Sequence, residues 1–444
     1  MLLKIKPKKT TGKLLFTGAL TALLLSNCSN SKPAEEKSNA AQETLMVSTY
    51  GKVMSINLEQ NKIQWQYQSK YNLEGNRNLF SISGDLLVQP FESGELIAFD
   101  LNTGKIIWQD HILGGGDGGE DAVATADGQL DTAFVNTLKP LFMTQPLIAE
   151  NNVYITSTNQ PESSNVPALY NFDKKTGEKI WIVPLPTVFN LFKPVLLNNF
   201  VFVNSAVYLN MYSKNAGTNT SYGTFDGADQ FPDAERNQFT NPIYTQMLSD
   251  GKNLYVGDEN AKFYALHFDN NNNLPVSDVM DPNNTFSKNA KLFKWKFDDQ
   301  SVSSIQEDGN TYLYDDYLLA AVNLTDKTEQ AIIAIDKGNG KLKWKTELKG
   351  IEEWRLAGDK ITATNGELIY ILDTDGKINL TIKTEKQFAP ISNIEIDKND
   401  DLIYATEQGI VKYEVKTKKF TMLLNQAFVK DQHNYFQVKY LKKK

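Results

Sequence analysis

Side chains that commonly carry out chemistry are scarce in this sequence. It has 444 residues, a single cysteine (Cys28) and three histidines. One thiol can form neither a disulfide within the chain nor a cluster of zinc-bound thiolates. The histidines, His111, His267 and His433, lie in unrelated segments, and no Ser/His/Asp arrangement, phosphate-binding loop or zinc motif is present. The sequence therefore predicts a protein that is not an enzyme and that uses no cofactor and no metal.

Cys28 lies at the point where a lipid anchor would be attached. Five lysines, from Lys4 to Lys13, precede an apolar stretch from Leu14 to Leu25, which is the pattern of a secretory signal. The Ser-Asn-Cys-Ser-Asn that follows resembles the lipobox of bacterial lipoproteins, in which the cysteine is acylated and becomes the first residue after cleavage. We expect residues 1–27 to be a lipoprotein signal peptide and residues 28–43, which have few apolar side chains, to be a flexible tether. The alternative is a plain secretion signal with an incidental thiol.

The net charge and the hydropathy of the sequence restrict which partners the protein can bind and how it can contact a membrane. The net charge of −7 offers no basic footprint for nucleic acid. No apolar run reaches the ~18 residues that a membrane-spanning helix needs, so we expect membrane contact through the lipid anchor alone. By the resemblance to lipoproteins, Ser29 after the cysteine indicates the outer membrane, and we expect the protein at its periplasmic face.

One sequence motif recurs along the chain and indicates a repeated supersecondary unit. The segment GELIAFDLNTGKIIWQ, residues 94–109, returns late in the chain as QAIIAIDKGNGKLKWK. The copies share an Asp or Asn, a Gly or Asn four residues later and a Trp eight residues later. These positions are Asn57, Asn61 and Trp65; Asp100, Gly104 and Trp108; Asp173, Gly177 and Trp181; and Asp336, Gly340 and Trp344.

Each copy predicts two antiparallel strands joined by a tight turn, because apolar and polar residues alternate on both sides of a polar break. A Gly or Asn at the fourth place suits a turn position with positive φ, and the Asp or Asn before it can hydrogen-bond the turn backbone. The Trp stands at the same place in every last strand. We therefore expect it to fill the gap between neighbouring units, which is a structural role.

A second predicted hairpin precedes each copy of the motif, as in PLIAENNVYITS and MLSDGKNLYVGD. Two hairpins make a four-stranded sheet of roughly 40 residues, which is the size of a propeller blade. Strong and weak copies together number eight, with seven as the alternative, and we expect residues 44–444 to form one all-β, eight-bladed propeller of four-stranded blades. The first copy lacks its leading strand, and the C-terminal YFQVKYL is a spare one. Their pairing would close the ring and protect both sheet edges.

The phrase AFDLNTGKIIW is similar to the repeat of the pyrroloquinoline-quinone-type propellers, and the similarity spans about 400 residues. This family includes non-enzymatic lipoproteins and also quinoprotein dehydrogenases, which commonly have adjacent cysteines near the quinone and carboxylates around calcium. The chain has no adjacent cysteines. Its lipobox, tether, length and eight units together resemble the BamB family, the lipoprotein subunits of the outer-membrane β-barrel assembly (Bam) complex.

This resemblance implies a non-enzymatic, lipid-anchored scaffold that binds the periplasmic domains of a BamA-like barrel-assembly protein. Two alternatives remain from the sequence. One is a quinone-dependent oxidoreductase. The other is a surface or periplasmic lipoprotein that binds another ligand, such as a glycan.

The resemblance also implies where the partner would bind. In the BamB family the partner surface uses a loop with the pattern Leu-x-Leu-Arg after the third Trp-bearing unit, and a pair of aspartates before a following unit. Here the loop after Trp181 reads IVPLPTVFNLFKP, with Phe192 near the second Leu and Lys193 at the Arg. The residues implied as partner-binding are Phe189, Leu191, Phe192, Lys193, Asp226, Asp229 and Asp233.

If the loop after Trp181 docks a partner, we expect its apolar residues to be exposed without a folding reason. An aromatic side chain beside a cation is typical of interface anchors. Ordinary solvated loop residues are the alternative. Two insertions, Gly114–Met143 and Asp269–Ala290, interrupt the repeats, and the first is the next candidate for a partner surface.

Overall fold

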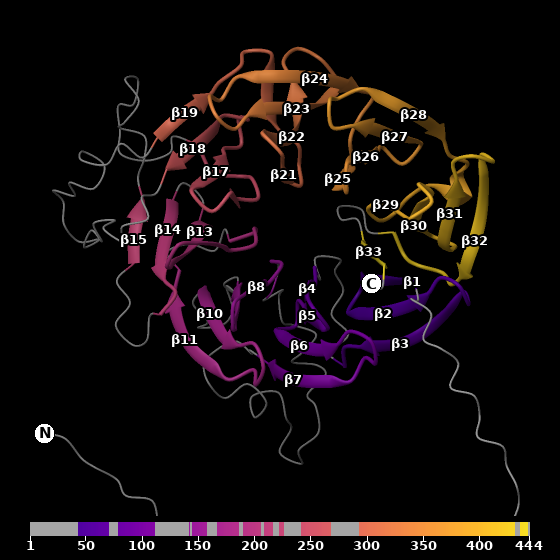
Figure 1. Ribbon diagram of the computed structural model, residues 1–444, viewed down its shortest axis with the longest axis horizontal. Helices are drawn as coiled ribbons and strands as arrows, with labels where there is room; N and C mark the ends of the chain where they lie inside the picture. The colour runs from indigo at the N-terminus through magenta and orange to yellow at the C-terminus, as the bar shows by residue number, and fades with distance from the viewer. Residues whose placement is uncertain are drawn as a thin grey trace, which may run out of the picture. The chain divides into compact units, whose positions relative to one another are not determined.

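The computed structural model is a ring of β-sheets, each built from consecutive antiparallel strands (Figure 1). It describes residues 43–70, 79–111, 142, 144–157, 167–185, 190–205, 208–215, 222–225, 241–267, 293–430 and 436–442. All of these belong to the unit Ala41–Lys444. Eight sheets follow one another around the ring, so the prediction of an all-β, eight-bladed propeller is confirmed. In the described ranges, no helix has both the length and the apolar character needed to cross a membrane.

The blades are numbered here in chain order, and their strands are given from the centre of the ring to the rim (Figure 1). Blade 1 has β33 (Gln437–Lys442), β1 (Glu43–Thr49), β2 (Lys52–Asn57) and β3 (Lys62–Gln68). Blade 2 has β4 (Ser81–Ser83), β5 (Leu86–Pro90), β6 (Glu95–Asp100) and β7 (Ile106–His111). Blade 3 has β8 (Leu147–Ala149), β9 (Asn152–Thr156), β10 (Ala168–Asp173) and β11 (Lys179–Pro184). Blade 4 has β12 (Val195–Leu197), β13 (Phe200–Ser205), β14 (Tyr208–Ser213) and β15 (Tyr222–Phe225).

The second half of the ring follows the same plan with one addition. Blade 5 has β16 (Leu248–Ser249), β17 (Asn253–Gly257), β18 (Phe263–His267) and β19 (Phe293–Phe297). Blade 6 has β20 (Val302–Ile305) and β21 (Thr311–Tyr314), which both pair with β22 (Tyr317–Leu324), then β23 (Gln330–Asp336) and β24 (Leu342–Leu348). Blade 7 has β25 (Glu353–Ala357), β26 (Lys360–Thr364), β27 (Leu368–Asp373) and β28 (Ile378–Lys383). A 3₁₀-helix, η2 (Lys386–Phe388), precedes blade 8, which has β29 (Glu395–Ile396), β30 (Leu402–Thr406), β31 (Gly409–Glu414) and β32 (Lys419–Asn425).

The two ends of the propeller close the ring within blade 1. Strand β33 pairs antiparallel with β1, with Val438 opposite Val47. Val438 is fully buried, and the Asn393 side chain of blade 8 brackets it by accepting from its N–H at 2.8 Å and donating to its carbonyl at 3.0 Å. The predicted closure by the C-terminal strand is therefore confirmed.

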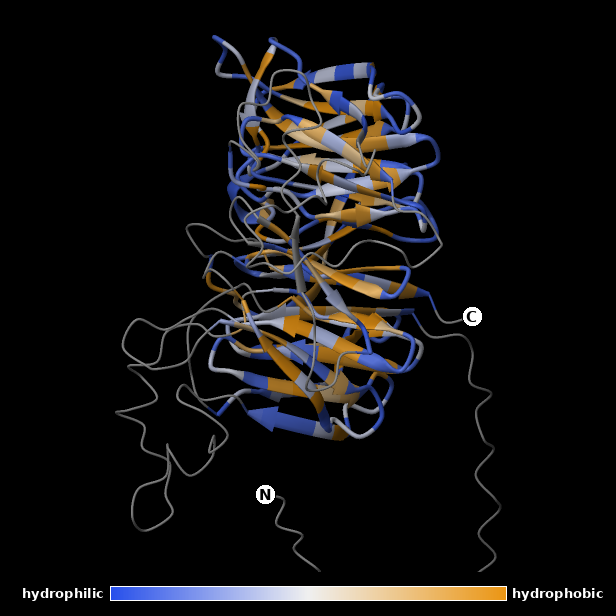
Figure 2. Cartoon of the chain, turned by 90° about the vertical axis from the view of Figure 1, so that its left-hand side faces the viewer, coloured by the Kyte–Doolittle hydropathy of each residue, from blue (hydrophilic) through white to orange (hydrophobic). Residues whose placement is uncertain are grey.

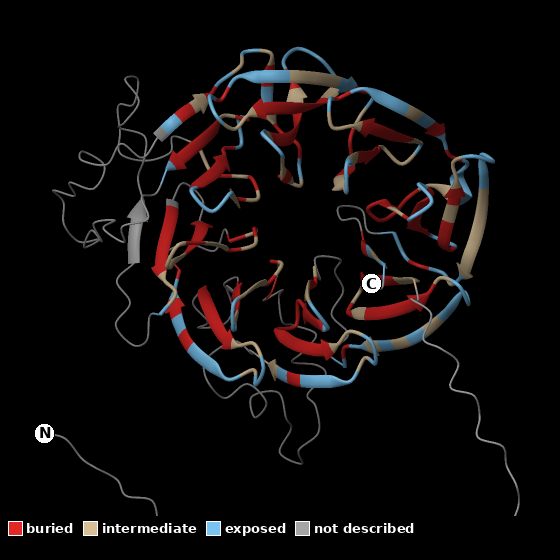
Figure 3. Cartoon of the chain, viewed as in Figure 1, coloured by how far each residue is buried: buried red, intermediate tan, exposed pale blue. Residues whose placement is uncertain are grey.

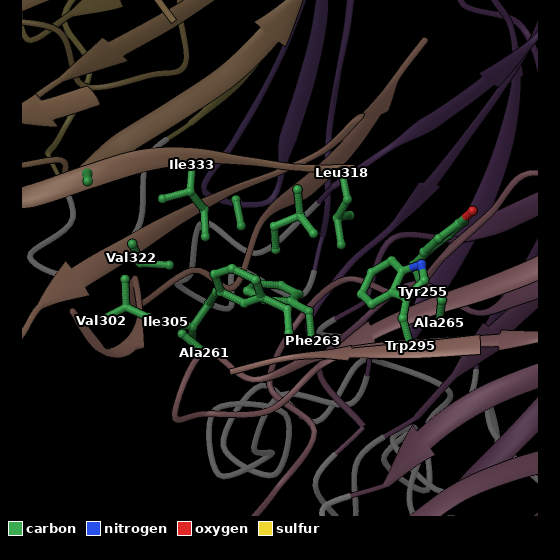
Figure 4. Close-up of a cluster of buried hydrophobic side chains, with 14 of the residues drawn as sticks. Tyr255, Ala261, Phe263, Ala265, Trp295, Val302, Ile305, Leu318, Val322 and Ile333 are labelled. Carbon is green, nitrogen blue, oxygen red and sulfur yellow. The ribbon is translucent and has the colours of Figure 1, made fainter. Parts of the chain in front are cut away.

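The hydrophobic core lies between neighbouring blades rather than at the centre of the ring. In one cluster, Phe263 and Trp295 of blade 5 pack with Leu318 and Ile333 of blade 6 (Figure 4). The two middle strands of each blade are mostly buried, the innermost strands are mostly of intermediate exposure, and the outermost strands are mostly exposed or intermediate (Figure 3). Apolar residues follow the strands, and hydrophilic residues gather at the turns on both faces (Figure 2). The core between several of these blades contains the repeated Trp.

The repeated Trp joins neighbouring blades by packing on a turn of the next blade. The Trp108 indole lies so close to Gly177 that a Cβ on this glycine would come within 2.6 Å of the ring. Gly177 has a φ of +73°, which glycine adopts without strain. The Trp108 Nε1–H also donates to the Lys174 carbonyl at 2.9 Å. The same packing joins Trp65 to Gly104, Trp295 to Gly340 and Trp344 to Gly376.

The Asp or Asn that opens these repeated turns holds the turn backbone. Asp173 Oδ1 accepts hydrogen bonds from the backbone N–H groups of Thr176 at 2.8 Å and Lys175 at 2.9 Å. These bonds favour the carboxylate and lower the pKa of Asp173. Asp100 and Asp336 accept equivalent backbone bonds in their own turns. The Asp shapes the turn on which the preceding blade's Trp rests.

A β-bulge precedes these Trp residues and turns them inward. In blade 2, Ala98 pairs with Trp108 while Phe99 pairs with Ile106, so Ile107 is the extra residue. In blade 3 the extra residue is Ile180. Their side chains are 48% and 49% exposed, respectively. The exposure of these isoleucines thus follows from the bulge that places the tryptophans.

Candidate partner-binding surface

The implied partner-binding residues belong to two connections that flank blade 4. Each connection runs from the outermost strand of one blade to the innermost strand of the next, from β11 to β12 and from β15 to β16. Because strand direction alternates within every blade, the strand ends that border the two connections lie on one face, at neighbouring blade junctions. Leu191, Phe192 and Lys193 are described. Phe189, Asp226, Asp229 and Asp233 lie outside the described residues, as do Cys28 and all of both insertions except Phe142.

Phe192 does not lie on the surface, so the expectation that it would be exposed is wrong. Its side chain is 9% exposed and meets Tyr244 edge-on, with ring centroids 5.6 Å apart. A Cβ added to Gly309 would come within 2.8 Å of the Phe192 ring, so this glycine makes room for it. Phe192 therefore belongs to the packing between blades, and replacing it would test stability rather than binding.

The backbone of Lys193 is fixed by hydrogen bonds, whereas its side-chain amine is unpaired. The Gln246 side chain accepts from the Lys193 N–H at 3.0 Å and donates to the Lys193 carbonyl at 3.1 Å. The amine has no hydrogen-bond or ion-pair partner among the residues that the structure describes. Burial lowers the pKa of Lys193, because desolvation disfavours the charged amine. A carboxylate from another molecule would compensate this cost.

Leu191 is the other described residue of this loop that can reach a partner. It is half-buried, whereas its neighbour Asn190 is fully buried. The described part of the loop thus offers one apolar side chain and one cation, both fixed by a buried backbone. This arrangement can bind an apolar residue next to an acidic one.

The two hydrogen bonds between the Gln246 side chain and the Lys193 backbone belong to a set of similar side-chain amide contacts that the sequence alone did not reveal. Gln145 donates to the Phe80 carbonyl at 2.7 Å, and Asn393 brackets Val438 as Gln246 brackets Lys193. Each of these amides follows a hydroxyl residue just before the first strand of a blade, in Thr-Gln or Ser-Asn dipeptides. These dipeptides are the signal that could have revealed the set. Their side chains tie the inner end of one blade to a neighbouring connection or, for Asn393, to strand β33.

Across the described ranges, no group of three or more His, Cys, Asp or Glu residues is arranged to hold a metal ion.

Comparisons with known proteins agree with the fold. The family model described as outer membrane protein assembly factor BamB matches residues 5–160. The structure of apo AztD from Citrobacter koseri is 11% identical, with 90% of this chain and 98% of that chain covered and a TM-score of 0.53. Dihydro-heme d1 dehydrogenase NirN is 12% identical, with 93% and 77% covered and a TM-score of 0.52. BamB from Moraxella catarrhalis is 16% identical, with 83% and 89% covered and a TM-score of 0.49. Comparison with curated protein sequences gave no match.

Proposed function

We propose that this chain is a non-enzymatic scaffold of the outer-membrane β-barrel assembly complex, lipid-anchored through Cys28 at the periplasmic face of the outer membrane. The observation that supports it most is the match of the BamB family model to residues 5–160, a stretch that includes Cys28 and strands β1 to β9. A rigid propeller suits this role, because its blades fix loops from distant parts of the chain on one face.

The proposed partner is a BamA-like protein, bound through its periplasmic domains. Lys193 would form an ion pair with an acidic residue of the partner, and Leu191 would pack against an apolar one. Phe189 and the acidic residues Asp226, Asp229 and Asp233 complete the proposed surface. Phe192 contributes by supporting the loop from the inside, since it packs against Tyr244.

Reversing the charge of Lys193 should weaken partner binding without unfolding the propeller. Removing an interface anchor typically costs about 2 kcal/mol or more, so we expect Lys193→Glu to raise the Kd for the purified periplasmic domains roughly thirtyfold or more. Titration calorimetry measures this change. The matched control is Lys175→Glu, because Lys175 is exposed on the Asp173 turn at the opposite face. If both variants bind like the wild type, the surface lies elsewhere, and the Gly114–Met143 insertion becomes the next candidate.

Loss of the lipid anchor should release the protein from the outer membrane. We expect Cys28→Ala to move the chain from the outer-membrane fraction to a soluble or inner-membrane-retained form. Ser29→Ala is the control: this variant should remain membrane-bound, in either the outer or the inner membrane. Mass spectrometry of the mature wild-type N-terminus should detect acylated Cys28. An unmodified N-terminus that begins at another residue would contradict this anchor.

A quinone-dependent oxidoreductase is the alternative, because solved structures that share the fold include a quinohemoprotein alcohol dehydrogenase from Comamonas testosteroni, 11% identical with a TM-score of 0.50. Titration with pyrroloquinoline quinone and calcium separates the two functions. Tight, stoichiometric binding with a shifted absorption spectrum would favour the enzyme.

A further inference from the structure

The outermost strand of blade 3, β11, differs from the other rim strands that carry the repeated Trp. In three of those strands the residues on either side of the Trp are polar or charged: Gln64 and Gln66 in β3, Lys294 and Lys296 in β19, and Lys343 and Lys345 in β24. In β7 one flanking residue is Ile107 and the other is Gln109. Of the Trp-bearing rim strands, only β11 has apolar residues on both sides, Ile180 and Ile182.

Both of these isoleucines are exposed at the rim. Ile180 is 49% exposed and Ile182 is 43% exposed, whereas Trp181 between them is 6% exposed. The bulge in β11 explains why Ile180 is exposed but not why it is apolar, because the bulged residue is a lysine in β19 and in β24. Lysine on an edge strand opposes pairing with a further strand. The edge of β11 lacks this protection.

The backbone of β11 also has a free edge beside these residues. In the described part of the chain, β11 pairs with β10 and with no other strand. The Leu185 N–H donates to the Pro167 carbonyl, just before β10, at 2.8 Å. Bonding direction alternates along a strand, so Trp181 faces β10 as Leu185 does. The Ile182 N–H and the carbonyls of Ile180 and Ile182 therefore point away from β10.

A second copy of β11 is complementary to this edge. When two copies run antiparallel about a two-fold axis at Trp181, perpendicular to the sheet, Ile180 of each copy lies opposite Ile182 of the other. Each Ile182 N–H then meets an Ile180 carbonyl of the other copy. The isoleucines of both copies come together on the exposed face, as cross-strand apolar pairs do in a sheet. The strand is thus self-complementary in its backbone and in its side chains.

The charges and the proline of β11 favour this register over its neighbours. Lys179 lies opposite Val183 of the other copy, so no like charges meet, and it keeps its ion pair with Asp110 at 3.3 Å. A shift of the register by two residues would place either Glu178 or Pro184 opposite an isoleucine. Because Pro184 ends β11 and has no N–H, it also limits the contact to one short strand.

We propose that the rim of blade 3 is an interface between two copies of this chain, which join edge to edge through β11 in a two-fold symmetric dimer. Such a contact uses the same surface on both copies, so it closes at two chains. A contact through one short strand is small, and we therefore expect a dissociation constant in the micromolar range or weaker. The interface uses neither Leu191 nor Lys193 and does not depend on the proposed scaffold function.

Sedimentation equilibrium of the full chain in density-matched detergent, from about 1 to about 100 μM, tests this dimer. We expect the protein mass to rise from one chain to two and to stop there. Ile182→Lys introduces the residue type that β19 and β24 have at this position. Because the two-fold axis places the change in the contact twice, it should raise the dimer Kd about tenfold or more.

Ile107→Lys is the matched control, since Ile107 is a bulged rim residue that is 48% exposed on the neighbouring blade. This variant should dimerise like the wild type. Ile182→Pro is a second test, because it keeps an apolar residue but removes the N–H that points away from β10. It should also raise the Kd about tenfold or more, with circular dichroism confirming that the propeller is folded.

Four results would each overturn the proposal. The first is a wild-type chain that stays monomeric over the whole concentration range, and the second is a mass that rises beyond two chains. The third is a Kd that is the same for the wild type and Ile182→Lys, which would place the contact elsewhere or in the detergent micelle. The fourth is a folded Ile182→Pro variant that dimerises like the wild type, which would exclude strand pairing.

Discussion

Trp108→Ala should lower the free energy of unfolding by about 3–5 kcal/mol, as truncation of large buried aromatic residues typically does. Trp108 is 6% exposed, donates to the Lys174 carbonyl and covers Gly177 of the next blade. Its loss leaves a cavity between blades 2 and 3 and an unpaired carbonyl. Chemical denaturation followed by circular dichroism measures the change.

Ile107→Ala is the matched control for this prediction. Ile107 is adjacent in sequence, apolar and 48% exposed, so its truncation should cost less than about 0.5 kcal/mol. The contact between Trp108 and Gly177 can be tested further with Gly177→Ala, which places a Cβ against the indole. In the Trp108→Ala background this second change should cost less than it does alone, since the ring is gone. Equal effects of Trp108→Ala and Ile107→Ala would show that the Trp is not an anchor between blades.

Deleting the closing strand, residues 437–444, should lower the free energy of unfolding by more than about 4 kcal/mol. Val438 is fully buried, and burying such a side chain contributes about 1.5–3 kcal/mol. The deletion also removes both hydrogen bonds between Asn393 and Val438, and the bond from the Phe80 N–H to Gln437. The edge of β1 would be left unpaired, so we also expect concentration-dependent association in light scattering.

The control for the deletion is Lys442→Ala, since Lys442 is the exposed last residue of β33. This change should leave stability within about 0.5 kcal/mol of the wild type. A deleted chain that unfolds at the same denaturant concentration as Lys442→Ala would contradict closure by the C-terminal strand.

The architecture could be predicted because the repeat encodes local rules. The spacing from Asp100 to Gly104 to Trp108 specifies a turn and the strand after it, and copies of one hairpin must stack to bury their apolar faces. The missing first strand of blade 1 and the spare C-terminal segment then imply how the ring closes. The fifth strand of blade 6, β20, has no such signal. It depends on pairing with β22, which β21 also contacts.

The partner surface could be predicted only in outline. The burial of Phe192 depends on Tyr244 and Gly309, which come from later parts of the chain, so the local sequence could not reveal it. Side chains that meet across blades are set by tertiary packing and not by the repeat.

Affinity purification of the lipid-anchored chain from detergent-solubilised membranes tests the scaffold function most directly. Mass spectrometry of the purified material should identify a BamA-like barrel-assembly protein in near-stoichiometric amount, and Lys193→Glu should sharply reduce it. Recovery of the intact propeller without any barrel-assembly protein, or with another partner in stoichiometric amount, would contradict the proposed function.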